Sequence, residues 1–473
     1  MLNTNVNICT STDSYKVSHW SQFPQGLEYT QYYVESRGGM FDAVFSDGFA
    51  RMVKILERGV TMKNVKRAQR LFKRHFGTEV FHTEGWKIIA DELGGKLPIR
   101  IRAVEEGLAV PVRNVLLVIE NTDPRFGWLP GYLETFILRA IWYPTTVGTI
   151  SFETKKIIRH FMNKTVDDDK IASVEPFRLH DFGARGVSSA ESAAIGGMSH
   201  LKNFLGTDTV EALEAAEDLY GMDIENFIAG FSIPAREHST TTIYGESGED
   251  DAFWNSINQW GEGMYACVMD SYDYEAAVKR ITTGELKDAI MSKGGTFVVR
   301  PDSGNPIDVV MQALEIISKN VGYTINSKGY KVLPPQYRVI QGDGVNMEEI
   351  RRIYTWMEGR GWSAENVAFG MGGGLLQQLD RDSLRFAMKV CCAIVDGEYR
   401  EVFKCPKTDV SKKSKKGYLD LIRNQDGELV TVALHEFGKV HKDSVLKTIF
   451  ENGHGTWNYT LERARELSDQ QAG

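Results

Sequence analysis

Apolar stretches that run directly into short polar loops recur through the C-terminal two-thirds of the chain, and a helical pattern follows each loop. They recur about every 25–40 residues, which is the length of a βα unit. The clear examples are FRLHDFGARG, FIAGFSIPAREHS, YACVMDSYD, TFVVRPDSGNP, YRVIQGDGV and NVAFGMGGG, with a fainter one in NFLGTDT. The pattern predicts an α/β fold, specifically an irregular, TIM-like α/β barrel. In such a barrel the loops after the strands carry the chemistry.

The segment before this series has a different pattern. Residues 44–95 predict amphipathic helices, with Thr61 and Thr83 as expected N-caps. The stretch LPIRIRAVEEGLAVPVRNVLLVIENT then alternates like β-strands. Two helical stretches follow, and we expect a break between them near Tyr143-Pro144 because proline lacks the helical N–H group.

After the series, the predicted helix LLQQLDRDSLRFAM leads into strand-like runs around two Asp-Gly pairs. Asp396-Gly397 and Asp426-Gly427 are typical of β-hairpin turns. Strand-forming sequence therefore flanks the barrel segment on both sides. We expect a second, β-rich α+β domain that is built from both termini.

The length of 473 residues also favours more than one domain, since about 150 residues per domain is usual. The predicted organisation has three parts. Residues 1–150 form the N-terminal part of the β-rich domain with its helices, residues 151–384 form the catalytic α/β barrel, and residues 385–473 return to the first domain.

Composition narrows the class of protein. A net charge of −8 gives no reason to expect nucleic-acid binding. The five cysteines are odd in number and lack metal-site spacing, which indicates reduced thiols in a cytoplasmic protein. The most apolar helical stretch, GYLETFILRAIWY, is short and is interrupted by Glu134 and Arg139, so no membrane span is expected.

Glycine-rich and charged loops are the candidate binding elements. Gly372 and Gly373 stand between a strand and a helix, where backbone N–H groups can approach a phosphate, and Arg381 follows. A tight structural turn explains these glycines about as well. Arg300 and Asp302 flank a proline and suit a phosphate and a ribose, or form a plain ion pair.

The remaining loops leave similar alternatives. Gly342 and Asp343 suit sugar hydroxyls or form an Asp-Gly turn. Phe182 with Arg185 suits a flat ring and a phosphate, unless the ring belongs to the core. His238 is catalytic or structural with similar weight. Together these loops indicate a phosphorylated sugar with a pyrophosphate leaving group, and Mg²⁺ held mainly by the phosphates.

Several longer strings resemble the nicotinamide phosphoribosyltransferases, which belong to the type II phosphoribosyltransferase family. The resemblance covers essentially the whole chain. The strings are TDSYKVSHW, ENTDP, WYPTTV, RLHDFG, RGVSS, GTDTV, MDSYD, RPDSGNP, NSKGYK, RVIQGDGV, GGGLLQ and SKKG.

The resemblance implies a pentosyltransferase of NAD salvage in pyridine nucleotide biosynthesis. The reaction joins nicotinamide to 5-phosphoribosyl 1-pyrophosphate and gives nicotinamide mononucleotide and pyrophosphate, with coupled ATP hydrolysis through a phosphohistidine. It also implies a homodimer with two active sites at its interface. The alternative reaction is that of a nicotinate phosphoribosyltransferase.

The resemblance assigns the base to three residues. Phe182 stacks on one face of the pyridine ring, and Tyr15 of the second subunit stacks on the other. Asp208 accepts a hydrogen bond from the carboxamide. A carboxylate at this place attracts an amide N–H group and repels a carboxylate, so Asp208 favours nicotinamide over nicotinate.

The resemblance assigns the other loops to the sugar and its phosphates. The implied contacts to the phosphoribosyl part are Arg300, Asp302, Gly342, Asp343, Gly372, Gly373 and Arg381. Arg185, Asp273 and the phosphorylated His238 lie on the side of the pyrophosphate and the metal. Lysines of the partner subunit complete the phosphate channel, namely Lys389, Lys404 and Lys412. His238, Asp302 and Arg300 are the implied catalytic residues, and no protein metal site is expected.

The mechanism implied for this reaction is dissociative. The bond to pyrophosphate loosens, positive charge develops on the ribosyl group, and the pyridine nitrogen attacks. The protein contributes positioning and electrostatics, and no general base is assigned.

The chain departs from the family pattern at four positions. Ala184 replaces a frequent tyrosine, and Met269 and Met371 replace frequent serines. Arg236 stands beside His238 where a small residue is usual, so we expect it to assist phosphate binding or to alter ATP coupling. These departures affect the expected kinetics more than the reaction.

Two other classes of function are weaker. A sugar-phosphate isomerase or aldolase would be supported by a Schiff-base lysine at a strand end, and none is found. A non-catalytic binding scaffold is disfavoured by the complete set of Arg, Asp, Gly and His residues in the loops.

Overall fold

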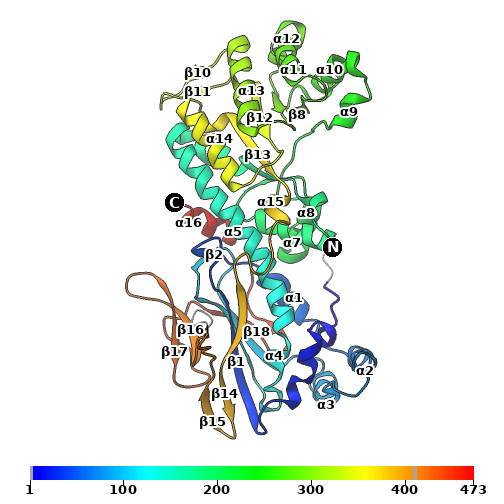
Figure 1. Cartoon of the computed structure of the whole chain (residues 1–473), viewed down its shortest axis with the longest axis vertical. Helices are drawn as coiled ribbons and strands as arrows, with labels where there is room; N and C mark the ends of the chain where they lie inside the picture. The colour runs from blue at the N-terminus through cyan, green and yellow to red at the C-terminus, as the bar shows by residue number, and fades with distance from the viewer. Residues whose placement is uncertain (1–3, 409–412) are drawn as a thin grey trace. The chain divides into compact units, whose positions relative to one another are not determined.

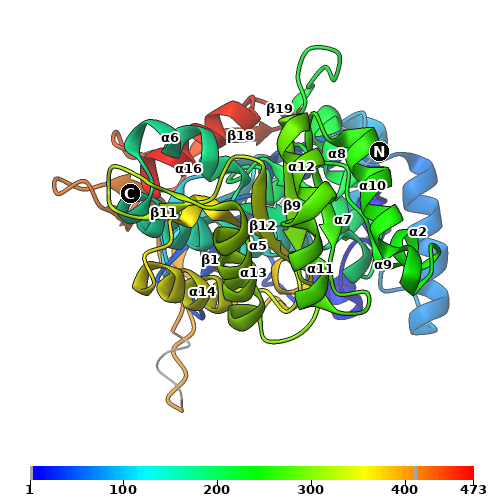
Figure 2. The same cartoon turned by 90° about the horizontal axis from the view of Figure 1, so that it is seen from above.

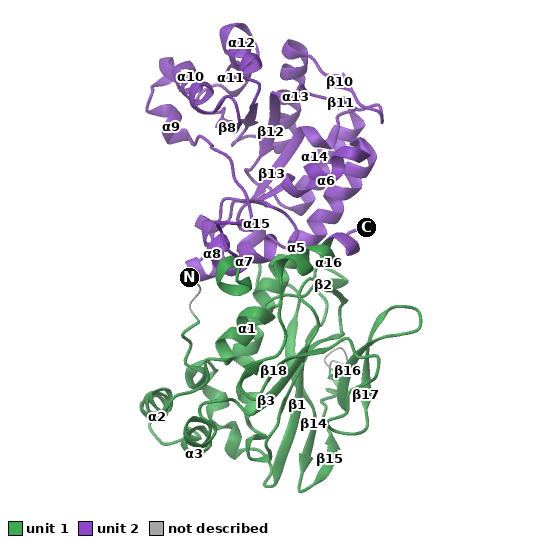
Figure 3. Cartoon of the chain, turned by 180° about the vertical axis from the view of Figure 1, so that it is seen from behind, with its two compact units in different colours: residues 1–149, 216–221, 379–468 green, residues 150–215, 222–378, 469–473 purple. Residues whose placement is uncertain are grey.

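The computed structural model describes residues 4–408 and 413–473. The chain forms two compact units, which Figure 3 distinguishes by colour. Unit 1 comprises residues 1–149, 216–221 and 379–468, and unit 2 comprises residues 150–215, 222–378 and 469–473. The sequence pattern placed residues 216–221 in the barrel and 469–473 in the β-rich domain, whereas each segment belongs to the other unit.

A six-stranded parallel sheet forms the centre of unit 2 (Figure 1). In spatial order its strands are β7 (Gly206–Thr207), β6 (Leu179–Asp181), β13 (Val367–Met371), β12 (Tyr337–Gln341), β9 (Thr296–Arg300) and β8 (Met264–Val268). Five of the seven apolar stretches supply β6, β8, β9, β12 and β13, and the faint GTDT stretch supplies β7. Because all neighbours are parallel, the loops after the strands meet at one edge of the sheet.

The remaining apolar stretch, residues 231–235, bridges both edges of this sheet. Phe231 pairs with Gly206 in β7, and Ala235 pairs with Ala266 in β8. Side chains from several strands also share one apolar cluster. Its members are Ala266, Val298 and Ile340, with Phe182, Ile233 and Ala368 packed against them. A shared interior of this kind is typical of a strongly curved sheet.

Helix α6 (Asp168–Val174) precedes the strands of unit 2, and further helices lie between or after them in sequence. They are α7 (Ala190–His200), α8 (Val210–Tyr220), α9 (His238–Thr242), α10 (Glu249–Trp260), α11 (Tyr274–Ile281), α12 (Gly284–Lys293), α13 (Pro306–Val321), α14 (Met347–Gly359) and α15 (Gly373–Leu376), and α8 continues into unit 1. A small hairpin pairs β10 (Thr324–Ile325) with β11 (Lys331–Val332). Helix α13 packs on β12 and lies beside α11 (Figure 2).

Unit 1 contains a seven-stranded antiparallel sheet. In spatial order its strands are β15 (Glu398–Glu401), β14 (Phe386–Val395), β1 (Leu27–Ser36), β5 (Val115–Asn121), β3 (Ile99–Ala103), β18 (Lys447–Glu451) and β19 (His454–Gly455). Two further pairs join β2 (Ala43–Phe45) to β4 (Ala109–Pro111) and β16 (Tyr418–Arg423) to β17 (Leu429–Leu434). Both predicted hairpins are confirmed, and strands from both ends of the chain share the sheet.

Helices cover the large sheet of unit 1 and share its apolar core. They are α1 (Phe49–Leu56), α2 (Met62–Phe76), α3 (Thr83–Lys87), α4 (Leu129–Tyr132) and the first part of α5 (Glu134–Thr165). Most of α16 (Leu461–Gln471) also belongs to unit 1. Thr61 caps α2 as predicted, because its hydroxyl accepts from the Asn64 N–H group. The prediction for Thr83 is wrong: α3 begins at Thr83, and His82 occupies the N-cap position.

The predicted helix break at Tyr143-Pro144 is also wrong. Helix α5 runs through Pro144 without interruption. Proline removes one N–H group from the helix and leaves the carbonyl of Ala140 without its usual donor. Gly48 lies against that carbonyl, and a Cβ there would be only 2.3 Å from its oxygen. Close packing of this glycine, together with burial of the surrounding helix, holds the proline within α5.

The long helix predicted from Leu375 to Met388 is likewise wrong. Helix α15 ends at Leu376, and strand β14 already begins at Phe386. The Asp380 carboxylate accepts from the N–H groups of Asp382 and Ser383, both at 2.8 Å. This turn is a local alternative to a helix, which aspartate favours.

The mixed α/β class is confirmed, with a parallel sheet in unit 2 and separate β-rich sheets in unit 1. A complete eight-stranded TIM barrel is not present within residues 4–408 and 413–473. Over the same residues, the structure contains no helix with the length and apolar character needed to cross a membrane.

Candidate functional site

The loops after the strands of unit 2 are joined by backbone hydrogen bonds. The Phe182 N–H group donates to the Met371 carbonyl at 3.0 Å, which links the loops after β6 and β13. Asp208 donates to the Asp181 carbonyl at 2.9 Å, and Met269 donates to the Arg300 carbonyl at 3.1 Å. Most of the predicted site residues in unit 2 therefore lie at one edge of one sheet.

The Phe182 ring lies directly over the ends of two neighbouring strands. A Cβ added to Gly370 would be 1.9 Å from Phe182 Cε2, and one added to Gly342 would be 3.0 Å away. The ring is half-buried and packs on the apolar interior of the sheet. One part of the ring contacts the core and the rest is accessible, so the contact of Phe182 with a flat ligand ring stays a prediction.

Asp208 follows β7 on the surface of this edge. Its carboxylate accepts a hydrogen bond from the Ser232 hydroxyl at 2.6 Å. Ser232 belongs to the segment that bridges both sheet edges, and its role was not predicted. Its position just after an apolar stretch was the available signal.

On the implied role of Asp208 as the acceptor for the base, Ser232→Ala is expected to raise KM for the base about 10-fold with little change in kcat, because the hydroxyl holds the Asp208 carboxylate through a charge-assisted bond. Steady-state kinetics would measure this. The exposed Ser173 of α6, which donates only to a local carbonyl, provides the matched control. Equal KM values in Ser232→Ala and Ser173→Ala would contradict the role.

His238 lies between two carboxylates at the start of α9. Its Nε2 is 2.8 Å from Asp270 Oδ1, and its Nδ1 is 3.8 Å from Asp302 Oδ2. Asp302 also accepts from the Arg300 guanidinium at 2.8 Å. The three residues predicted to be catalytic thus form one network, with the imidazole about half exposed.

Asp270 is the part of this network that the sequence reasoning missed. Its side chain is nearly buried, and its second oxygen accepts from the Ser303 hydroxyl. The motif MDSYD directed attention to Asp273, three residues later. The available signal was that Asp270 stands closer to the end of β8.

The glycine loop lies beside the turn that carries Arg185. A Cβ on Gly186 would be 3.9 Å from the Gly373 nitrogen, and one on Gly372 would be 3.5 Å from the Phe182 carbonyl. The Arg185 side chain is exposed on this turn. Helix α15 has only four residues, so a phosphate here would depend on loop N–H groups and arginine rather than on a long helix.

Two predicted residues have structural partners of their own. Asp273 caps α11, since its carboxylate accepts from the Ala276 N–H group at 2.9 Å. Asp343 is exposed after β12, and its carbonyl accepts from the Gln341 amide at 2.9 Å. These contacts leave the Asp343 carboxylate available for a ligand, whereas Asp273 already has a role in the helix.

Two family models match this chain, one over most of unit 2 and the end of unit 1, the other over the beginning of unit 1. Residues 177–454 match the nicotinate phosphoribosyltransferase (NAPRTase) family, and residues 7–101 match the nicotinamide phosphoribosyltransferase N-terminal domain. The chain belongs to the nicotinate phosphoribosyltransferase family.

Curated relatives agree along the whole chain. A protein from Xanthomonas campestris named nicotinamide phosphoribosyltransferase is 46% identical over 469 residues, with 98% of each chain covered. One of the same name from Acinetobacter baylyi is 29% identical, again with 98% of each chain covered.

Solved structures support the fold at much lower identity. Nicotinate-nucleotide pyrophosphorylase from Pyrococcus furiosus has a TM-score of 0.64 at 15% identity and covers 100% of this chain and 97% of its own. Human nicotinic acid phosphoribosyltransferase has a TM-score of 0.58 at 15% identity, with 97% and 93% covered.

In this member of the nicotinate phosphoribosyltransferase family, Asp181 is a buried acid beneath the site. Burial raises the pKa of its carboxyl group to about 6. Oδ1 accepts from the Gly183 N–H group at 2.7 Å, which shapes the turn after Phe182. The neighbouring His180 is half-buried, and desolvation of its imidazole lowers its pKa to about 4, so it is neutral at pH 7.

Asp181→Asn is expected to stabilise the fold at neutral pH. The pKa of this carboxyl group is 3.8 in the unfolded chain and about 6 in the folded protein. The free energy of unfolding therefore falls as pH increases from 3.8 to about 6, and the loss stays constant at higher pH. Asparagine removes this loss, which amounts to about 3 kcal/mol at full effect, and retains the acceptor for Gly183. Denaturant unfolding at pH 4 and pH 7.5 would measure it. A gain of equal size at both pH values would contradict the assignment.

The remaining predicted residues belong to unit 1. Tyr15 is 60% exposed, and Lys404 is exposed. Lys389 is half-buried, with its ammonium 3.8 Å from Glu134, and burial lowers its pKa. Arg381 lies in the turn that precedes β14. Their part in a site with unit 2 stays a prediction. Lys412 lies outside the described residues.

The departures from the family pattern have different consequences. The Arg236 guanidinium donates to the Thr240 carbonyl of α9 and to Asn255 and Ser256 of α10, and its part in phosphate binding or ATP coupling stays a prediction. Met269 and Met371 are fully buried, so each serves the core. Ala184 begins the short turn with Arg185, and a small side chain leaves that turn open.

No group of three or more His, Cys, Asp and Glu side chains that could hold a metal ion occurs in the part of the chain that the structure describes. Within the described residues, the carboxylates of Asp270 and Asp302 both lie within 4 Å of a ring nitrogen of the predicted catalytic residue His238. They are hard oxygen donors of the type that Mg²⁺ accepts together with substrate phosphates.

Proposed function

We propose that the chain transfers the phosphoribosyl group of 5-phosphoribosyl 1-pyrophosphate to nicotinamide and yields nicotinamide mononucleotide and pyrophosphate in NAD salvage. The observation that carries this proposal is the full-length similarity to a relative named for that activity, at 46% identity over 98% of both chains. The site in unit 2 agrees with it, since a ring platform, an acidic residue and a charged network lie at one sheet edge.

The base would bind on the exposed part of Phe182. A pyridine ring is flat and suits an aromatic surface from which glycines exclude other side chains. Asp208, held by Ser232, would accept the carboxamide N–H group. A negatively charged acceptor disfavours the carboxylate of nicotinate, which is why nicotinamide is the proposed substrate.

The sugar and phosphates would bind along the neighbouring loops. Arg300 has a planar guanidinium suited to a phosphate, and its partner Asp302 suits ribose hydroxyls or the positive charge that develops on the sugar. Gly372 and Gly373, with Arg185 beside them, would hold phosphate groups. Mg²⁺ bound with the phosphates would neutralise pyrophosphate as it leaves.

His238 is proposed as the residue that ATP phosphorylates. Support comes from its half-exposed imidazole and from the carboxylates on both sides of it. Asp270 fixes the orientation of the ring through one nitrogen. Phosphorylation would place a dianion beside Arg300 and so change how the site holds pyrophosphate.

We also propose a cytoplasmic homodimer. In this arrangement Tyr15 of the second subunit would stack on the free face of the base, and Lys389, Lys404 and Lys412 would enter the phosphate channel. Support comes from the large exposed fraction of the Tyr15 ring. An aromatic side chain that is exposed in one chain gains apolar contact when a ligand ring packs on it.

Asp208→Asn tests the choice of base. We expect the ratio of kcat/KM for nicotinamide to that for nicotinate to fall about 10-fold, because the amide no longer repels a carboxylate. Competition between the two bases at fixed phosphoribosyl pyrophosphate would measure the ratio. Asp223→Asn, in an exposed turn, is the matched control. A wild-type preference for nicotinate would overturn the proposed function.

A further inference from the structure

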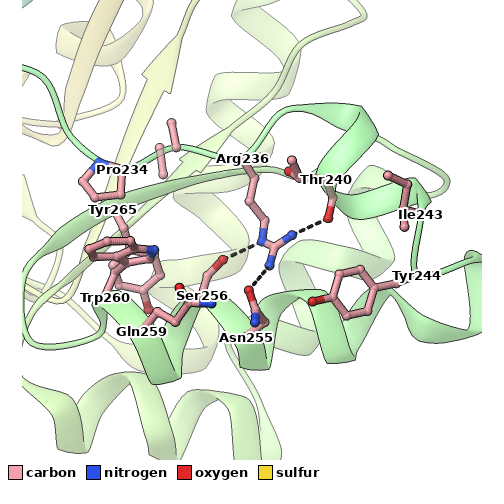
Figure 4. Close-up of a pocket in the computed structure, with 12 residues that line it drawn as sticks. Pro234, Arg236, Thr240, Ile243, Tyr244, Asn255, Ser256, Gln259, Trp260 and Tyr265 are labelled. Carbon is pink, nitrogen blue, oxygen red and sulfur yellow. Dashed lines mark hydrogen bonds between the residues drawn. The ribbon is translucent and has the colours of Figure 1, made fainter.

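A pocket of about 480 Å³ lies beside the segment that leads to His238 (Figure 4). It is formed by this segment, β8 and the helices α9 and α10. Its lining residues are Pro234, Ala235, Arg236, Thr240, Ile243, Tyr244, Asn255, Ser256, Gln259, Trp260, Tyr265 and Ala266. The ligand-binding side chains predicted for the phosphoribosyl reaction are not among them.

Arg236 is a buried cation with neutral partners. The residue is 9% exposed, and its guanidinium donates to the Ser256 hydroxyl, the Thr240 carbonyl and the Asn255 amide oxygen. No ion pair links it to a carboxylate in the described residues, and the pocket lining contains no aspartate or glutamate. Three of its five N–H groups are used, so two remain for a further acceptor.

A buried charge without a counter-ion is unfavourable. In the proteins where such a charge persists, an anion commonly binds to it through charge-assisted hydrogen bonds. The fixed partners of Arg236 hold the guanidinium in one orientation, as Figure 4 shows. This arrangement resembles a prepared anion site more than a surface arginine.

Aromatic side chains form the rest of the pocket. Trp260 is 48% exposed, and Tyr244 lies under the guanidinium, with 5.6 Å between its ring centre and the Arg236 Cζ atom. Tyr265 is 1% exposed, and its hydroxyl is buried without a hydrogen-bond partner. An unpaired buried hydroxyl beside a cavity is a second sign that a polar ligand group belongs there.

We propose that this pocket binds a small planar aromatic anion. Its carboxylate would accept from the free N–H groups of Arg236 and from the Tyr265 hydroxyl, and its ring would pack on Trp260. Arg236 also binds the carbonyl of Thr240 in α9, the helix that begins with His238.

Calorimetric titration of the full chain with 1-naphthoate, with nicotinamide present throughout, tests the proposal. We expect one saturable site in the wild type. Arg236→Ala should weaken binding at least about 10-fold, and the neutral 1-naphthamide should bind the wild type at least about 10-fold more weakly than the acid. Phe182→Ala, which removes the ring platform at the other site, should leave the affinity within about 2-fold.

Trp260→Ala is the second variant, because a half-exposed ring can be removed without loss of the fold. It should weaken 1-naphthoate binding at least about 5-fold. Equal affinity in the wild type and in both pocket variants would overturn the proposal. The absence of saturable binding at millimolar 1-naphthoate, or loss of binding in Phe182→Ala, would do the same.

Discussion

Asp302→Ala is expected to lower kcat about 1000-fold while the fold is retained. Asp302 contacts Arg300 at 2.8 Å and also faces His238 at 3.8 Å. Its removal releases the arginine and takes away the negative charge nearest to the predicted position of the ribosyl cation. Initial rates of mononucleotide formation at saturating substrates would measure the effect.

Asp288→Ala provides the matched control, since this carboxylate is exposed on α12 and makes only a long contact to its neighbour Lys287. We expect unchanged kcat in the control and unchanged circular dichroism in both variants. A turnover in Asp302→Ala that equals the control would show that the Arg300–Asp302 pair is only a structural ion pair.

Gly370→Ala is expected to lower kcat/KM for nicotinamide about 100-fold, since a displacement of about 1 Å in a binding platform has effects of this size. The added Cβ would lie 1.9 Å from Phe182 Cε2, which is far inside normal contact, so the ring must leave its position. The Phe182 backbone stays in place through its bond to the Met371 carbonyl. The loss should therefore concern the base, while KM for phosphoribosyl pyrophosphate changes little.

Gly359→Ala is the control for this change, because a Cβ at Gly359 meets no atom within 4 Å. A crystal structure of Gly370→Ala would show the new position of the ring. Wild-type kcat/KM in Gly370→Ala with a displaced ring would contradict the assignment of Phe182 to the base.

The sheet of unit 2 was predictable because each strand is a short apolar run that ends in a polar loop. A continuous apolar run indicates a strand that is buried on both faces of the sheet, and the polar residues after it indicate where the strand ends in an exposed loop. The bridging segment 231–235 was found as one of the stretches, but its single bridges to both sheet edges depend on curvature, which no local pattern contains.

The errors have a common origin in tertiary contacts. Pro144 normally interrupts a helix, yet packing against Gly48 keeps α5 continuous. Leu375 to Met388 has helical periodicity, yet the Asp380 turn ends the helix early. In both places a local preference is outweighed by an interaction that the sequence pattern does not encode.

In the candidate site, too, some features follow from the sequence and others depend on tertiary contacts. The positions of Phe182 and Asp302 directly after strands could be read from the sequence, and their roles stay predictions. Asp270 and Ser232 contact the predicted site residues His238 and Asp208, and such contacts are visible only in three dimensions. Arg236 is two residues before His238 in the sequence, but its side chain extends to Asn255 of α10.

The most direct test of the account is to incubate the purified protein with nicotinamide, phosphoribosyl pyrophosphate and Mg²⁺, with and without ATP, and to quantify mononucleotide and pyrophosphate. We expect equal amounts of nicotinamide mononucleotide and pyrophosphate, and faster formation of both when ATP is present. Failure to form the mononucleotide from nicotinamide, while nicotinate reacts under the same conditions, would contradict it.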